Sequence, residues 1–130
     1  ENTTGATAVR SGGKSANGSV VRRLALIGGY AGVEGEFHGI HLRASATVEE
    51  VAISGFQGDG IHALAAAGAG AGAEGNVNCS RIEKVRVTGC RNGLFLDSAD
   101  ANACTVIGCD FSSNRQWGVW DSSFLGNSYF

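Results

Sequence analysis

Apolar and polar residues alternate in a regular way in four short stretches of the chain. In each stretch the first, fourth and sixth residues are apolar; the stretches are 21–26, 48–53, 82–87 and 106–111. Each is followed, at a variable distance, by a glycine and an aliphatic residue; these pairs are Gly39-Ile40, Gly60-Ile61, Gly93-Leu94 and Gly118-Val119. Because successive side chains of a β-strand point to opposite faces, the pattern predicts strands with one buried face.

These elements form an internal repeat at intervals of roughly 24 to 34 residues. Such a period is typical of a solenoid, in which stacked units bury a continuous core. We therefore expect an all-β solenoid of about four coils with three inward columns of equivalent residues. The columns are Val21, Val48, Ile82 and Val106; Leu24, Val51, Val85 and Cys109; and Leu26, Ile53, Val87 and Phe111. The four glycines are expected to stack at a corner where backbones approach closely.

Charged residues fall on the outward face of the same strands. Arg22 is expected beside Glu49, and Arg86 beside Asp110. Strands lie about 4.8 Å apart, so opposite charges meet across them, and each exposed pair contributes ~0.2–1 kcal/mol. We interpret these rows as solvated charge ladders that fix the register.

Composition agrees with a packed β protein. The 21 Gly, the absence of Pro and the 17% of charged residues describe a chain that is apolar enough to pack and too rich in turns to be helical. With a net charge of −2 and scattered Lys and Arg, no nucleic-acid partner is expected. No apolar run approaches the ~20 residues that a membrane span needs.

The predicted organisation has two parts. Residues 1–18 are expected to be a flexible or incomplete N-terminal arm, and residues 19–130 to form coils that continue beyond residue 130. The Ala-Gly-rich stretch 65–78 is expected to be the largest loop. Since an open end leaves unpaired strand edges, we expect a homo-oligomer or a piece of a longer chain.

The stacked strands and the stretch 114–130 resemble the right-handed parallel β-helix proteins of the pectate-lyase-like superfamily, over about residues 19–130. The segments 97–102 and 117–127 look like uncharacterised bacterial surface and phage tailspike members. The resemblance implies a right-handed parallel β-helix solenoid, an extracellular, cell-surface or virion-associated location, and polysaccharide as the partner. Because one scaffold serves many sites, it does not define the chemistry.

Motifs of the enzymes in this superfamily are matched only in part. Gly58-Asp59-Gly60 and Arg81-Ile82-Glu83 resemble fragments of the polygalacturonase motifs, without an assembled carboxylate pair. Asp59, His62 and Arg91 are the candidates for catalysis, and whether the chain is an enzyme stays open. No cofactor is expected, with Ca²⁺ as the alternative that the resemblance to pectate lyases implies, through acids such as Asp59, Asp97 and Asp100.

The best candidate site is an outward column beside the stacked glycines. We predict that it binds carbohydrate, because aromatic faces beside polar groups suit sugar rings; its members are His41, His62, Phe95 and Trp120, with Trp117 from the neighbouring column of His38, Asp59 and Asn92. The alternative is that the tryptophans pack beneath loops or against another subunit.

The histidines and cysteines carry weaker signals. His38, His41 and His62 come close on neighbouring strands, but without a fixed carboxylate or Cys partner no metal site is predicted. Cys79 and Cys104 could form a disulfide, whereas Cys90 and Cys109 are expected to be buried. Two functions follow: a polysaccharide-contacting protein, with a lyase or glycoside hydrolase activity left open, or a structural, self-assembling subunit.

Overall fold

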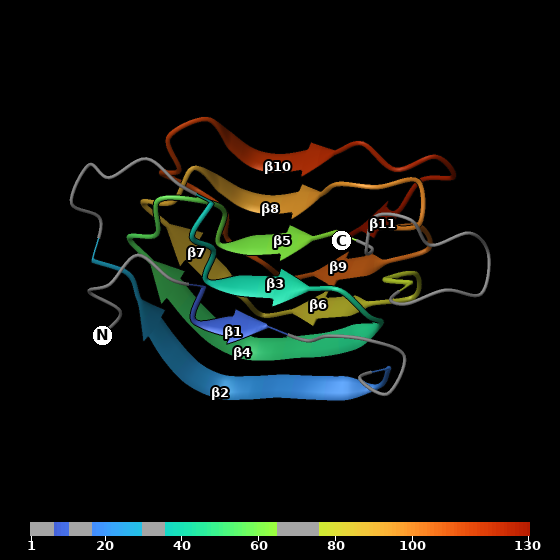
Figure 1. Ribbon diagram of the computed structural model, residues 1–130, viewed down its shortest axis with the longest axis horizontal. Helices are drawn as coiled ribbons and strands as arrows, with labels where there is room; N and C mark the ends of the chain where they lie inside the picture. The colour runs from blue at the N-terminus through green and yellow to red at the C-terminus, as the bar shows by residue number, and fades with distance from the viewer. Residues whose placement is uncertain (1–6, 11–16, 30–35, 65–75) are drawn as a thin grey trace.

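Two parallel β-sheets make up the computed structural model, which describes residues 7–10, 17–29, 36–64 and 76–130. The first sheet has five strands in the order β1 (Val9–Arg10), β3 (Ile40–Leu42), β5 (Ile61–Ala63), β8 (Asn92–Leu96) and β10 (Trp117–Asp121). The second has β2 (Ser19–Ile27), β4 (Ala46–Ser54), β6 (Arg81–Glu83), β9 (Thr105–Ile107) and β11 (Ser128–Tyr129), and β7 (Arg86–Thr88) also pairs with β4. Both sheets therefore follow the chain order from one edge to the other (Figure 1).

The expected fold class, a right-handed parallel β-helix solenoid of about four coils, was wrong. The described chain is all-β, but it forms two parallel sheets, one of five strands and one of six. The hydrophobic repeat identifies which residues pair, because a one-residue slip would move every side chain to the opposite face. It does not determine how the paired strands are distributed over sheets.

The predicted strand register was confirmed. Val21 pairs with Val48, Val48 with Ile82, and Ile82 with Val106, as the first inward column requires. These side chains join one hydrophobic cluster with residues of the first sheet such as Ile40 and Leu94, so the core lies between the two sheets. Full burial of each aliphatic side chain contributes about 1.5–3 kcal/mol.

The third residue of each repeat explains why the apolar positions are the first, fourth and sixth. Arg23 and Glu50 have φ of 54°, Lys84 of 51° and Gly108 of 57°. A single residue in this left-handed region interrupts the strand alternation and returns the next residue to the core face. Only Gly108 adopts this conformation without steric cost.

The predicted glycine column is also present, at the start of the strands of the first sheet. A Cβ on Gly39 would lie 2.7 Å from the carbonyl oxygen of Gly60, and a Cβ on Gly60 would lie 2.9 Å from that of Gly93. On Gly60 it would also overlap Val87 of the second sheet. The column therefore allows the two sheets to approach each other.

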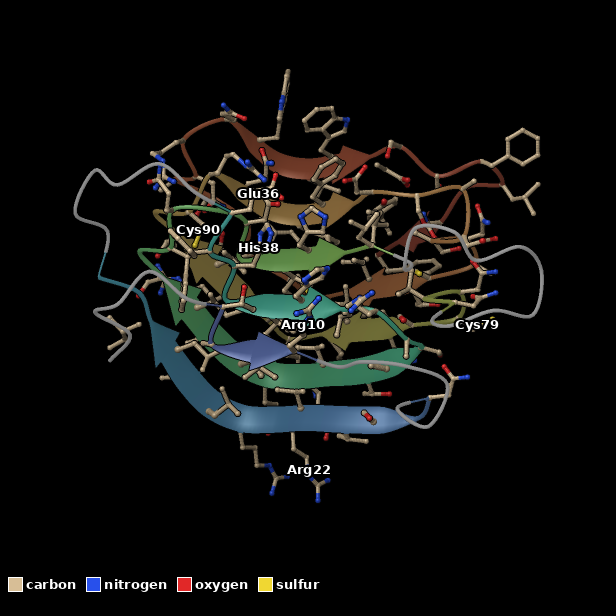
Figure 2. The ribbon with its side chains drawn as sticks, viewed as in Figure 1. Arg10, Arg22, Glu36, His38, Cys79 and Cys90 are labelled. Atoms are coloured by element: carbon tan, nitrogen blue, oxygen red, sulfur yellow. The ribbon has the colours of Figure 1, made fainter. Side chains whose placement is uncertain are left out.

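The outer face of the second sheet carries the predicted charge ladders. Arg22 lies 3.5 Å from Glu49, and Arg86 lies 3.4 Å from Asp110. Figure 2 shows Arg22 pointing away from the first sheet.

Val9–Arg10, inside the predicted N-terminal arm, forms β1, whereas most of the predicted loop 65–78 lies outside the described residues. No helix among the described residues is long and apolar enough to cross a membrane.

Candidate functional site

One row of side chains crosses the outer face of the first sheet from edge to edge. Strand pairing places equivalent positions side by side, in the order Arg10, His41, His62, Phe95 and Trp120. The predicted column is therefore in register, and Arg10 extends it by one strand. Parallel pairing brings about this arrangement because neighbouring strands lie about 4.8 Å apart.

The rings of this row are in contact. His62 packs edge-on against Phe95 with centroids 5.1 Å apart, and Phe95 stacks on Trp120 at 4.4 Å with an interplanar angle of 14°. Trp117 and Trp120 are 58% and 44% exposed, whereas Phe95 is 8% and His62 is 2% exposed. The tryptophans therefore form the exposed part of the predicted carbohydrate face.

A second row, formed by His38, Asp59, Asn92 and Trp117, precedes the glycine column. Hydrogen bonds from backbone to backbone align it, since Gly39 donates to the carbonyl of Asp59 and Gly60 to that of Asn92. His38, Asp59 and Asn92 are buried. The outer face of the first sheet thus carries a polar cluster that is closed to solvent.

Asp59 is the centre of this cluster. Its Oδ1 accepts hydrogen bonds from Asn92 Nδ2 at 2.7 Å and Arg91 Nε at 3.0 Å. Its Oδ2 lies 2.6 Å from His62 Nδ1 and accepts a hydrogen bond from Arg91 Nη2 at 2.9 Å. Arg91 therefore grips the carboxylate with two parallel bonds, an arrangement about twice as strong as a neutral pair. Burial alone would raise the pKa of Asp59, but contacts with His38, His62 and Arg91 hold this pKa well below its usual range.

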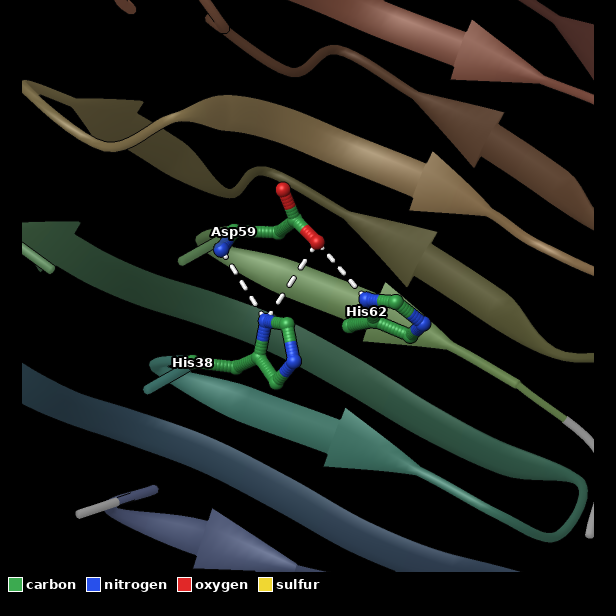
Figure 3. A group of neighbouring side chains, drawn as sticks. All are labelled: His38, Asp59 and His62. Carbon is green, nitrogen blue, oxygen red and sulfur yellow. Dashed lines mark hydrogen bonds and ion pairs between the residues drawn. The ribbon is translucent and has the colours of Figure 1, made fainter. Parts of the chain in front are cut away.

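Both histidines beside Asp59 face a carboxylate. His38 Nδ1 accepts a hydrogen bond from the backbone N–H of Asp59 at 3.0 Å and lies 3.3 Å from Oδ2 of the same residue (Figure 3). His62 Nε2 lies 3.4 Å from Asp97 Oδ2, yet it has no hydrogen-bond partner among the residues that the structure describes. Burial, followed by the charges of His62, His38, Arg10 and Arg43, lowers the pKa of His41 to about 4.

The three catalytic candidates, Asp59, His62 and Arg91, are brought together by the fold, and Asp97 joins them. No sequence motif predicts these pairings. Asp59 and His62 are three residues apart across the bend at Gly60, and Arg91 comes from the next turn of the chain. The candidate ligand atoms in this cluster are imidazole nitrogens of His38 and His62 and a carboxylate oxygen of Asp59. Calcium takes six to eight oxygen ligands, so this cluster does not fit calcium.

The cysteines contribute no reactive group to this face. All four are free thiols, so the suggested bond between Cys79 and Cys104 is not formed. Cys90 is buried as expected, and Cys109 is partly buried. Burial raises the pKa of Cys90, Cys104 and Cys109, which disfavours the nucleophilic thiolate.

Comparisons with family models, curated proteins and solved structures found no match to this chain. The resemblance to the pectate-lyase-like superfamily accordingly stays a prediction.

Proposed function

We propose that the protein contacts polysaccharide through the outer face of its first sheet, with Trp117 and Trp120 as the contact residues. The observation that carries this proposal is that β10 presents two exposed indoles, one of which stacks on Phe95. Large aromatic side chains usually bury most of their area in a folded chain. Two exposed tryptophans on one strand are therefore a surface suited to an apolar face of a ligand.

Sugar rings have such faces, bordered by hydroxyl groups. The stacking of Trp120 on Phe95 restricts the indole before any ligand arrives, which lowers the entropy lost on binding. Arg10 lies in the same row and supplies a hydrogen-bonding group at its other end. His62 and Phe95 in the middle of the row are buried, so the exposed contact surface is the β10 end of the row. The extracellular location expected from the resemblance belongs to this proposal.

The test is a titration of the protein with neutral and acidic polysaccharides, followed by tryptophan emission and calorimetry. Trp120→Ala and Trp117→Ala should each lower the affinity at least tenfold while the circular dichroism spectrum stays unchanged. Phe124→Ala, which removes an aromatic side chain that is 81% exposed and outside the row, is the matched control. Unchanged affinity in both tryptophan variants would contradict the proposed role of Trp117 and Trp120.

Catalysis is measured in the same titration by the ultraviolet absorbance of newly formed unsaturated ends. A rise that disappears in Arg91→Lys or His62→Gln would identify a lyase that uses the Asp59 cluster. Binding without new absorbance and without new reducing ends would identify a binding surface alone.

A second candidate function is self-association. Large apolar side chains are exposed in and around β10 and β11; they are Val119, Phe124, Leu125, Tyr129 and Phe130. Both strands lie at a sheet edge, and edges with unpaired backbone groups pair readily with another chain. Sedimentation velocity over a range of concentrations tests this function, since assembly that is indifferent to sugars favours it over polysaccharide contact.

A further inference from the structure

Two buried histidines converge on one oxygen of a buried carboxylate. His62 Nδ1 lies 2.6 Å and His38 Nδ1 lies 3.3 Å from Oδ2 of Asp59, and these side chains are at most 3% exposed. The ligand atoms of the three residues all lie within 4.8 Å of one another (Figure 3). Two imidazole nitrogens and a carboxylate oxygen are donors that first-row transition metals such as zinc accept.

A neutral His62 ring carries one N–H proton, so it cannot donate to both Asp59 and Asp97. If Nδ1 carries the proton and donates to Asp59, the lone pair of Nε2 faces the carboxylate of Asp97 at 3.4 Å. If Nε2 carries the proton, the lone pair of Nδ1 faces Asp59 instead. In a buried site an uncompensated contact between two acceptors is costly. A positive charge at His62, either a second ring proton or a metal ion, would remove this contact between two acceptors.

His38 has the same problem at the same oxygen. Its Nδ1 accepts the backbone N–H of Asp59, so this nitrogen carries no proton while it lies 3.3 Å from Oδ2. A second proton on His62 would leave this contact unresolved. One cation between the two histidines and Oδ2 would resolve both contacts. The lone pair of His38 would then turn to the ion, and the backbone N–H of Asp59 would give up His38 Nδ1 as its acceptor.

We propose that His38, Asp59 and His62 bind one divalent transition-metal ion of the zinc class. Ligand atoms on a tetrahedral zinc, with bonds of about 2.0–2.1 Å, lie about 3.3 Å apart. His38 Nδ1 and Asp59 Oδ2 are already at this spacing, and His62 has to withdraw by less than about 1 Å. The Nε2–H of His62 then donates to Asp97, the outer partner that metal-bound histidines usually have. Arg91 and Asn92 hold Oδ1 of Asp59 and orient the carboxylate, and Arg91 Nη2 also donates to Oδ2 at 2.9 Å.

His41 is the natural control for this site. It adjoins His62 in the same row, with ring centroids 5.2 Å apart, but it is not part of the group of ligand atoms that lie within 4.8 Å of one another. The full chain, free of any affinity tag and stripped of metal by a chelator, is titrated with Zn²⁺ and Co²⁺ by calorimetry and visible absorption. We expect one ion per chain, a Co²⁺ spectrum of low coordination number and a higher melting temperature with Zn²⁺.

Variants assign the ligands. His38→Gln and His62→Gln should each weaken Zn²⁺ binding at least 100-fold, Asp97→Asn by about 10–100-fold, and His41→Gln should leave it unchanged. Asp59→Asn is less informative, because it also removes the partner of Arg91.

Ring-proton NMR of the wild-type chain gives an assignment that needs no variant. Zn²⁺ should shift the resonances of His38 and His62 and not those of His41. Absence of Zn²⁺ binding by the folded wild-type chain would overturn the site. Binding that depends on His41 but not on His38 and His62 would overturn it as well.

Discussion

The outer faces of the two sheets carry similar ion pairs in opposite environments. On the second sheet, Arg86 and Asp110 face solvent, with side chains 70% and 49% exposed. On the first sheet, Asp59 is fully buried and Arg91 only 27% exposed, and two histidines and Asn92 complete the network. Parallel pairing in register produces both rows, so stacking explains why like positions are adjacent. It does not explain why one row is closed to solvent.

This difference separates a structural role from a functional one. Exposed ion pairs contribute about 0–1 kcal/mol and are readily replaced. A buried charged network costs several kcal/mol of desolvation for each ion and is weak support for stability in itself. Buried ionisable clusters with perturbed pKa values occur preferentially at functional sites. The first sheet is therefore where binding chemistry is expected, and the second sheet provides the scaffold.

The largest effect is expected from removing the partner of the buried carboxylate. Arg91→Ala should lower the free energy of unfolding by about 3–5 kcal/mol, because it leaves the buried carboxylate of Asp59 without its guanidinium partner. Arg86→Ala, the matched change on the exposed ladder, should lower it by about 0–1 kcal/mol. Urea unfolding of both variants, with metal removed by a chelator, measures the difference. Equal losses would show that the two faces are energetically alike.

The next largest effect concerns the glycine column behind the buried cluster. Gly60→Ala should destabilise the chain by about 1–3 kcal/mol, because the added methyl group overlaps Val87 and the Gly93 carbonyl. Gly118→Ala, at the edge of the same column, meets its nearest neighbour at 3.2 Å and should cost less. Urea unfolding measures both losses, and a Gly118→Ala loss as large as that of Gly60→Ala would contradict the role given to the column.

A smaller effect, of opposite sign, is expected on the second sheet. Lys84 has a φ of 51°, which a side chain disfavours. Lys84→Gly should therefore raise the free energy of unfolding by about 0.5 kcal/mol, the relief of strain being partly offset by the greater freedom of glycine in the unfolded chain. Arg86→Gly, in an extended segment of the same repeat, should lower it. A loss in both variants would show that the bend at residue 84 is not strained.

The sequence predicted strand pairing far better than it predicted architecture or chemistry. Side-chain alternation is a local property, so the pairing of Val21 with Val48 and of His41 with His62 followed from aligned positions. The grouping of strands into two sheets depends on the turns between them, which the repeat does not describe. The three histidines alone do not predict a metal site, because the sequence pattern places no fixed carboxylate beside them. Asp59 provides one, because the bend at Gly60 turns its side chain toward His62, and alternation along a straight strand does not predict this.

The smallest effect contrasts two carboxylates of the first sheet. Asp121 pairs with Leu96 at the edge of the sheet and is exposed, unlike Asp59. Burial tends to raise the pKa of Asp121, but hydrogen bonds from Asn127, Ser123 and Tyr129 lower it to about 2. The ionised form is thus favoured in the folded chain, so its contribution to stability is complete above the ordinary pKa of 3.8 and is lost as the pH falls toward 2.

Asp121→Asn should remove this part of the pH dependence. Thermal unfolding of the wild type and the variant across this pH range should give curves that converge at the acid end and separate above pH 4, with the wild type more stable. The separation should be small, because solvent screens a charge at this edge. Curves that stay parallel would mean that Asp121 is as ionised in the unfolded chain as in the folded one, and that its bonds to Ser123, Asn127 and Tyr129 do not stabilise the edge of the first sheet.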